Sequence, residues 1–171
     1  DDGDEYTFCY DCYTSRTSCK PIHDYYYKPD PLFRGDGDRY FGVELEVDGA
    51  GEDDDNAAEV MSIANGNGLE NLYCKHDGSL DDGFEMVTHP MTLAYHQAEM
   101  PWEAILRKVV QMGYKSHQAG TCGLHVHVNR NAFGETETQQ DAVIARILFF
   151  FEKNWEELLK FSRRTQYQLD Q

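Results

Sequence analysis

The sequence has little positive charge and lacks several motifs that would indicate a function directly. Only 15 of its 171 residues are Lys or Arg, against 31 Asp and Glu, so the net charge is −16. This balance argues against binding to a nucleic-acid backbone or an anionic membrane, because both need a basic face. The sequence contains no run of 18 apolar residues and no G-x-x-x-x-G-K-[ST] or G-x-G-x-x-G loop. We therefore expect no membrane-spanning helix, no P-loop and no Rossmann dinucleotide site.

Cysteine is scarce and unevenly placed. The five cysteines are Cys9, Cys12, Cys19, Cys74 and Cys122. The odd number, with no signal peptide, favours a reducing compartment. The first three cysteines and His23 are ligands of the kind that Zn²⁺ takes, which makes a structural zinc site one interpretation. Free thiols, or half of a zinc ribbon, are the alternatives. The last two cysteines lie in apolar stretches, and we expect them to be buried as small hydrophobic residues.

The first 38 residues differ in composition from the rest of the chain. They are rich in Tyr, Asp and Pro, show no sustained periodicity, and end in a turn-forming cluster at residues 35–38. We interpret residues 1–38 as a cysteine-containing extension and linker laid on the body of the protein. Residues 39–171 are interpreted as one α+β core.

Alternating polarity predicts strands in the core. Residues 40–48 alternate strictly, and residues 121–129 are predicted as a strand that alternates from Leu124 onward. Residues 72–75 and 84–89 are predicted as a further pair of strands around a turn at 77–79. Aliphatic residues share one face of the two alternating strands: Val43, Leu45, Val47, Leu124, Val126 and Val128. Polar or ionisable residues share the other face: Glu44, Glu46, Asp48, His125, His127 and Asn129.

Helical periodicity appears in three stretches, at residues 57–64, 101–113 and, longest of all, about 138–162. The predicted buried stripe of the long helix is Val143, Ile147, Phe151, Trp155, Leu158 and Leu159. Strands and helices in this order predict an α+β fold with helices on one face of a mainly antiparallel sheet. The other face of such a sheet is left free.

Ionisable side chains gather on the predicted free face. Glu44 and Glu46 are two residues apart on a strand and point the same way, as do His125 and His127. Glu85 joins them if its strand pairs with either. Clustered carboxylates repel one another and a divalent cation relieves this, so the patch suits Mg²⁺ or Mn²⁺ better than a structural zinc ion. The alternative is a solvated strand surface. Divalent ions could also neutralise the phosphates of ATP without a basic groove.

Four segments of the chain carry a family resemblance. They are residues 40–48 (YFGVELEVD), 75–80 (KHDGSL), 83–90 (GFEMVTHP) and 121–128 (TCGLHVHV). The helix that ends with FSRR at 161–164 and the cysteine-containing start are similar to the same family. In this order the segments resemble the phage and bacterial amidoligase family, carboxylate–amine ligases with a glutamine synthetase-like fold.

The resemblance implies a curved antiparallel sheet whose concave face binds metal-ATP. Glu44 and Glu46 would be metal ligands, and Glu85 a third acidic ligand or a substrate contact. One histidine of the pair would meet a metal or the phosphates. The residues assigned to catalysis are Glu46, Glu85, His127 and Arg130. Those assigned to the nucleotide are Lys75, Asp77, Ser79 and His125. Those assigned to metals are Glu44, Glu46, Glu85, His125 and His127, with Cys9, Cys12, Cys19 and His23 for zinc.

The implied reaction is ATP-dependent amide formation through an acyl phosphate. Its partners would be a small-molecule or peptide carboxylate and an amine, with no nucleic-acid polymer and no membrane, in the cytoplasm of a bacterium or a phage-infected cell.

Related ligases add a later strand with an acid and a phosphate-clamping arginine. We expect this strand to be missing through C-terminal truncation, which leaves Arg130 as the best-placed cation. The alternatives are a non-catalytic, metal-stabilised binding module of the same fold, or a cupin-like metal enzyme. The oligomeric state stays open.

Overall fold

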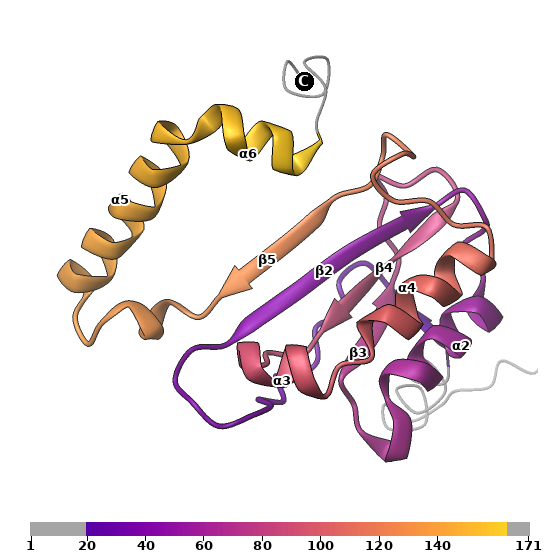
Figure 1. The fold of residues 1–171 in the computed structure, drawn as a ribbon. Helices are drawn as coiled ribbons and strands as arrows, with labels where there is room; N and C mark the ends of the chain where they lie inside the picture. The colour runs from indigo at the N-terminus through magenta and orange to yellow at the C-terminus, as the bar shows by residue number, and fades with distance from the viewer. Residues whose placement is uncertain (1–19, 164–171) are drawn as a thin grey trace, which may run out of the picture.

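An open, mixed sheet of five strands lies at the centre of the computed structural model, which describes residues 20–163 (Figure 1). The strands are β1 (Ile22–His23), β2 (Phe41–Asp48), β3 (Leu72–Lys75), β4 (Gly83–Thr88) and β5 (Leu124–Val128). Their order across the sheet is β1-β3-β4-β2-β5. β2 is antiparallel to both β4 and β5, and β3 is antiparallel to β4. The α+β class and the four strands predicted from the sequence are confirmed.

Strand β1 was not predicted, because it lies in the segment interpreted as a linker. It pairs in parallel with β3 and makes the sheet mixed rather than wholly antiparallel. Ile22 is buried in the core, and its amide donates to Asp54 Oδ1 at 3.0 Å. Further along, Arg34 pairs with the backbone at Met91. Residues 20–38 are therefore built into the body of the protein at several points.

Three helices cover one face of the sheet: α2 (Asp54–Ala64), α3 (Leu93–Ala98) and α4 (Trp102–Gln111) (Figure 1). Asp53 caps α2 by accepting from the Asn56 amide at 2.8 Å. Short 3-10 turns, η1 (Gly66–Gly68) and η2 (Arg130–Phe133), connect other elements. The core between helices and sheet includes Val47, Ala57, Val60, Cys74, Phe84, Met86, Ile105 and Val109. Cys74 is buried as expected, whereas Cys122 is partly exposed.

The long C-terminal helix differs from its prediction in two respects. It consists of α5 (Glu137–Lys153) and α6 (Trp155–Ser162), separated at Asn154, whose side chain donates to the Phe150 carbonyl at 2.7 Å. Figure 1 shows both helices beyond β5, away from α2, α3 and α4. The predicted burial of the stripe is wrong, since Ile147, Phe151 and Trp155 are exposed.

Within residues 20–163, no helix has both the length and the apolar character that a membrane span requires.

Asp48, at the end of β2, accepts more hydrogen bonds than any other carboxylate of residues 20–163. These bonds connect the end of β2, the turn before β4 and the segment before β5. It accepts from the amides of Gly49 at 2.8 Å, Asp81 at 3.1 Å and Asp82 at 2.7 Å, and from the Thr121 hydroxyl at 2.5 Å. Burial acts to raise the pKa of Asp48, but these hydrogen bonds outweigh it and hold that pKa below its ordinary value. Asp48 is therefore a structural residue, although the alternation places it on the ionisable face.

We expect Asp48→Asn to lower the free energy of unfolding at neutral pH by about 2–4 kcal/mol, because an amide nitrogen would face backbone donors. Folding lowers the pKa of Asp48, so its contribution is complete above the unfolded-state pKa and is lost as the pH falls through the folded-state pKa. The difference between variant and wild type should therefore shrink in acid. Urea unfolding from neutral to acidic pH measures it, with the exposed Asp36→Asn as control. Equal stability of both variants would contradict the assignment.

Candidate metal centre

The strand register places the predicted site residues in two neighbouring rows across the free face of the sheet. In one row Glu85 of β4 lies between Lys75 of β3 and Glu46 of β2. In the next row Glu44 of β2 lies opposite His125 of β5. Directly opposite residues have Cβ atoms about 5 Å apart, so side chains from four strands meet here.

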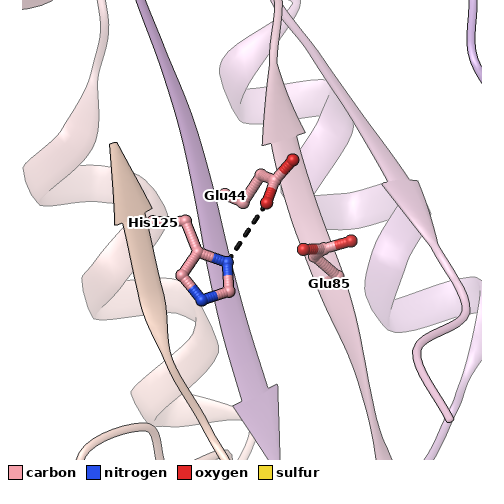
Figure 2. Close-up of side chains that lie close together, drawn as sticks. All are labelled: Glu44, Glu85 and His125. Carbon is pink, nitrogen blue, oxygen red and sulfur yellow. Dashed lines mark hydrogen bonds and ion pairs between the residues drawn. The ribbon is translucent and has the colours of Figure 1, made fainter. Parts of the chain in front are cut away.

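Glu44 links the two histidines of β5. Its Oε2 lies 3.2 Å from His125 Nδ1, and its Oε1 lies 3.2 Å from His127 Nε2. Burial acts to raise the pKa of Glu44, but the hydrogen bonds and charge of His127 and His125 outweigh it and lower that pKa. Figure 2 shows Glu44 and His125 joined in this way, with Glu85 on the adjacent strand facing the same space. Glu44 therefore stays ionised and orients both imidazole rings.

Glu85 has the least favourable electrostatic surroundings among the carboxylates of the site. It is 4% exposed, and its ion-pair partner, Lys75 Nζ, lies 3.6 Å away, beyond normal hydrogen-bond distance. Burial first, and then the charge of Glu44, raises the pKa of Glu85. The Lys75 ammonium opposes this rise and also lies 5.2 Å from the ring centroid of Tyr25. A further cation near Glu85 would stabilise its ionised form.

Glu46 is held by the backbone of Gly123, the residue directly before β5 in the chain. The Gly123 amide donates to Glu46 Oε2 at 2.5 Å, and the Glu46 amide donates to the Gly123 carbonyl at 3.2 Å. A Cβ on Gly123 would lie 3.2 Å from His125 Nε2 and 3.4 Å from Glu46 Oε2, which is tighter than ordinary contact. Gly123 is thus a site residue that the sequence analysis missed. Its place two residues before the H-x-H pair is the signal that could have found it.

The turn between β3 and β4 brings a fourth carboxylate to the site. Asp77 Oδ1 accepts from the Ser79 amide at 2.7 Å and from the Ser79 hydroxyl at 2.6 Å. The Ser79 hydrogen bond is the main reason that the pKa of Asp77 is lowered. Ser79 therefore positions Asp77 and favours its ionised form, while the nucleotide contact predicted for Ser79 stays a prediction.

Two groups of possible ligand atoms overlap at Glu85. Glu44, Glu85 and His125 form one group, and Glu46, Asp77 and Glu85 form the other. Within each group the ligand atoms lie within 4.8 Å of one another. Carboxylate oxygens with one imidazole nitrogen suit a hard divalent cation such as Mg²⁺ or Mn²⁺. The predicted metal ligands are therefore brought together, except that His127 contacts Glu44 and lies outside both groups.

Several predicted residues lie elsewhere. Arg130 of η2 pairs with Asp141 of α5 at 2.7 Å and not with a carboxylate of the cluster. His23 lies in β1 and stacks on Tyr27 with the ring centroids 3.6 Å apart. Cys9, Cys12 and Cys19 lie outside the described residues, so the zinc site stays a prediction.

An aromatic cleft of about 460 Å³ adjoins the cluster at Glu44 and His127. Its lining includes Phe33, Tyr40 and Tyr73. Burial and the charges of Glu44 and Glu85 raise the pKa of Tyr73 to about 12, so its hydroxyl stays protonated. Tyr73 is not among the site residues predicted from the sequence. The alternation of β3, which buries Leu72 and Cys74, could have placed it on the ionisable face.

Comparisons with protein-family models, curated proteins and solved structures gave no match to this chain.

Proposed function

We propose that the free face of the sheet binds divalent cations and that the protein is an ATP-dependent carboxylate–amine ligase. The observation that carries the proposal is the overlap of two ligand groups at the buried Glu85. Overlapping sites that share one carboxylate are suited to a pair of ions on a polyphosphate. The resemblance to amidoligases supports the same conclusion, and with it the finer assignment of a glutamine synthetase-like fold with a curved, mainly antiparallel sheet.

The residues fit Mg²⁺ or Mn²⁺ in the chemistry of their donors. Glu44, Glu85 and His125 would hold one ion, and Glu46 and Asp77, with Glu85 shared, would hold another. Bound there, the ions would supply positive charge for the phosphates of ATP and for the charge that develops during phosphoryl transfer. This role matters because the cluster contains a single ammonium group, that of Lys75, among the described residues.

The remaining parts of the site suit the two halves of the reaction. The substrate carboxylate would attack the γ-phosphate of ATP and release ADP, and the amine would then attack the acyl phosphate and release phosphate. Lys75 lies beside Glu85, where it can donate to a phosphate oxygen. His127 is exposed and is oriented by Glu44, so it can take the proton that the attacking amine loses. The aromatic cleft beside His127 can receive the adenine ring of ATP or an apolar group of the substrate.

A non-catalytic binding module of the same fold is the second candidate. The observation that favours it is the Arg130–Asp141 ion pair, which engages the predicted phosphate clamp away from the cluster. The cupin-like alternative is not supported, because the sheet of residues 20–163 is open and flanked by helices, whereas cupins are double-sheet jelly rolls.

We expect Glu85→Gln to reduce Mn²⁺ affinity at least tenfold and yet to stabilise the metal-free protein. Folding raises the pKa of Glu85, so its charge destabilises the native state as the pH rises from the unfolded-state to the folded-state pKa. Removing the charge should raise the unfolding free energy at neutral pH, with no difference in strong acid. Calorimetry with Mn²⁺ and urea unfolding with EDTA measure the two effects.

The matched control for Glu85→Gln is Glu103→Gln, on the exposed surface of α4, where Glu103 pairs with Arg107. We expect it to leave Mn²⁺ affinity unchanged. If Glu85→Gln kept wild-type Mn²⁺ affinity, the shared-ligand assignment would be wrong.

We expect the protein to release ADP from Mg-ATP when amino-acid or peptide mixtures supply a carboxylate and an amine. Glu46→Gln should reduce this rate at least a hundredfold, because it removes a ligand charge while keeping an oxygen that can accept from Gly123. A coupled ADP assay, with mass spectrometry for the amide product, measures both steps.

Three outcomes separate the candidates. Equal ADP release by wild type and Glu46→Gln would refute the site. Metal-dependent ATP binding without turnover would favour the binding module. Loss of activity in Glu103→Gln as well would show a non-specific effect of removing surface charge.

A further inference from the structure

The helix-covered side of the sheet is incomplete at β5. On this side Leu124 and Val126 of β5 and Leu106 and Val110 of α4 are between 43% and 69% exposed. A hollow of about 440 Å³ lies next to them, lined by Leu45 of β2 and by α4. We call this surface, formed by Leu106, Val110, Leu124 and Val126, the sheet patch. It is apolar and continuous with the core, so an apolar partner covering it would extend that core.

A second apolar surface lies on the C-terminal helices. The helix patch consists of Ile147, Leu148, Phe150, Phe151 and Trp155, which are between 40% and 61% exposed. At 3.6 residues per turn, Ile147 and Phe151 lie on the side of Gln140, the buried residue of that helix, and Leu148 and Phe150 flank them at the two borders of the patch. Phe149 is also exposed but points to the opposite side, since it is two residues from Ile147 and from Phe151.

The connection between the two patches is held by hydrogen bonds. Asn129, directly after β5, accepts from the Tyr40 amide at 2.8 Å and donates to the Asp38 carbonyl at 2.9 Å. Gln140 of α5 donates to the Gly134 carbonyl at 3.0 Å, and Arg130 pairs with Asp141 at 2.7 Å. These bonds fix the direction in which α5 leaves the sheet, and α5 and α6 lie beyond β5 rather than over the sheet (Figure 1).

From these observations we propose that two copies of the chain form a dimer by reciprocal exchange, in which α5 and α6 of each copy cover the sheet patch of the other. A large apolar residue that is half exposed has about 100 Å² of solvent-accessible surface. One exchange then buries about 900 Å² from the two patches, and two exchanges bury about 1,800 Å², within the size range of stable interfaces. The exchange buries both patches and leaves the hydrogen bonds around Asn129 intact.

Sedimentation or light scattering of the full chain at micromolar concentration tests the dimer. We expect the wild type to have twice the mass of one chain. Ile147→Glu and Phe151→Glu should each be monomeric, with the dissociation constant raised at least a hundredfold, because they place a carboxylate within the interface. The matched control is Phe149→Glu, which adds the same charge to the other side of α5 and should remain a dimer. Circular dichroism verifies that each variant is folded.

Mixing two variants tests the exchange itself. Val126→Glu spoils the sheet patch and Phe151→Glu spoils the helix patch, so each should be monomeric alone. Mixed together they retain one intact helix–sheet pair, and we expect a heterodimer. A monomeric wild type would overturn the proposal, and so would dissociation by Phe149→Glu equal to that by Phe151→Glu. A dimer that mixing does not restore would show helix–helix or sheet–sheet association and would also overturn it.

Discussion

The pairing of β2 with β4 on one side and β5 on the other is the constraint on which the rest of the structure depends. This register sets Glu46 opposite Glu85 and Glu44 opposite His125, while Val47 on the reverse face enters the core. A slip of one residue would carry the carboxylates into the core and the aliphatic residues out of it. Core packing and site geometry are therefore specified by the same hydrogen-bond ladder, and the helices on one face stabilise the arrangement of charges on the other.

Carboxylates on the neighbouring strands β2 and β4 have different roles because their surroundings differ. The Asp48 carboxylate meets three backbone amides and a hydroxyl, so ionisation is favourable and its charge is fully used within the fold. Glu85, opposite Glu46, has a distant ammonium and like charges around it, and ionisation is unfavourable there. A fold that maintains such a group at neutral pH gives up stability, and a bound cation would restore it. The contrast distinguishes a structural acid from a proposed metal ligand.

Sequence patterns predicted the four strands of the antiparallel part of the sheet, and alternating polarity predicted the face on which Glu44, Glu46 and His125 gather. Glu85 was expected there only on the condition that its strand pairs with one of the others, and the register meets that condition. Other features had no such signal. β1 is two residues long, too short for any periodicity, and its position depends on Ile22 reaching the core. The end of α5 at Asn154 depends on a local side-chain hydrogen bond within a continuous helical period. The partner of Arg130 is set by how η2 meets α5, which depends on tertiary geometry.

The period of α5 indicates that one side of the helix is buried, but a period does not specify the surface that buries it. In one chain that side of α5 is exposed, and so are Leu124 and Val126 at the edge of the sheet. Both surfaces are apolar, and each is costly in water at about 25 cal/mol per Å². The prediction of a buried stripe was therefore wrong for the single chain, yet the sequence pattern that produced it still needs a physical explanation. Burial between two chains would explain both surfaces, and the acidic face that carries the site would stay open on each copy.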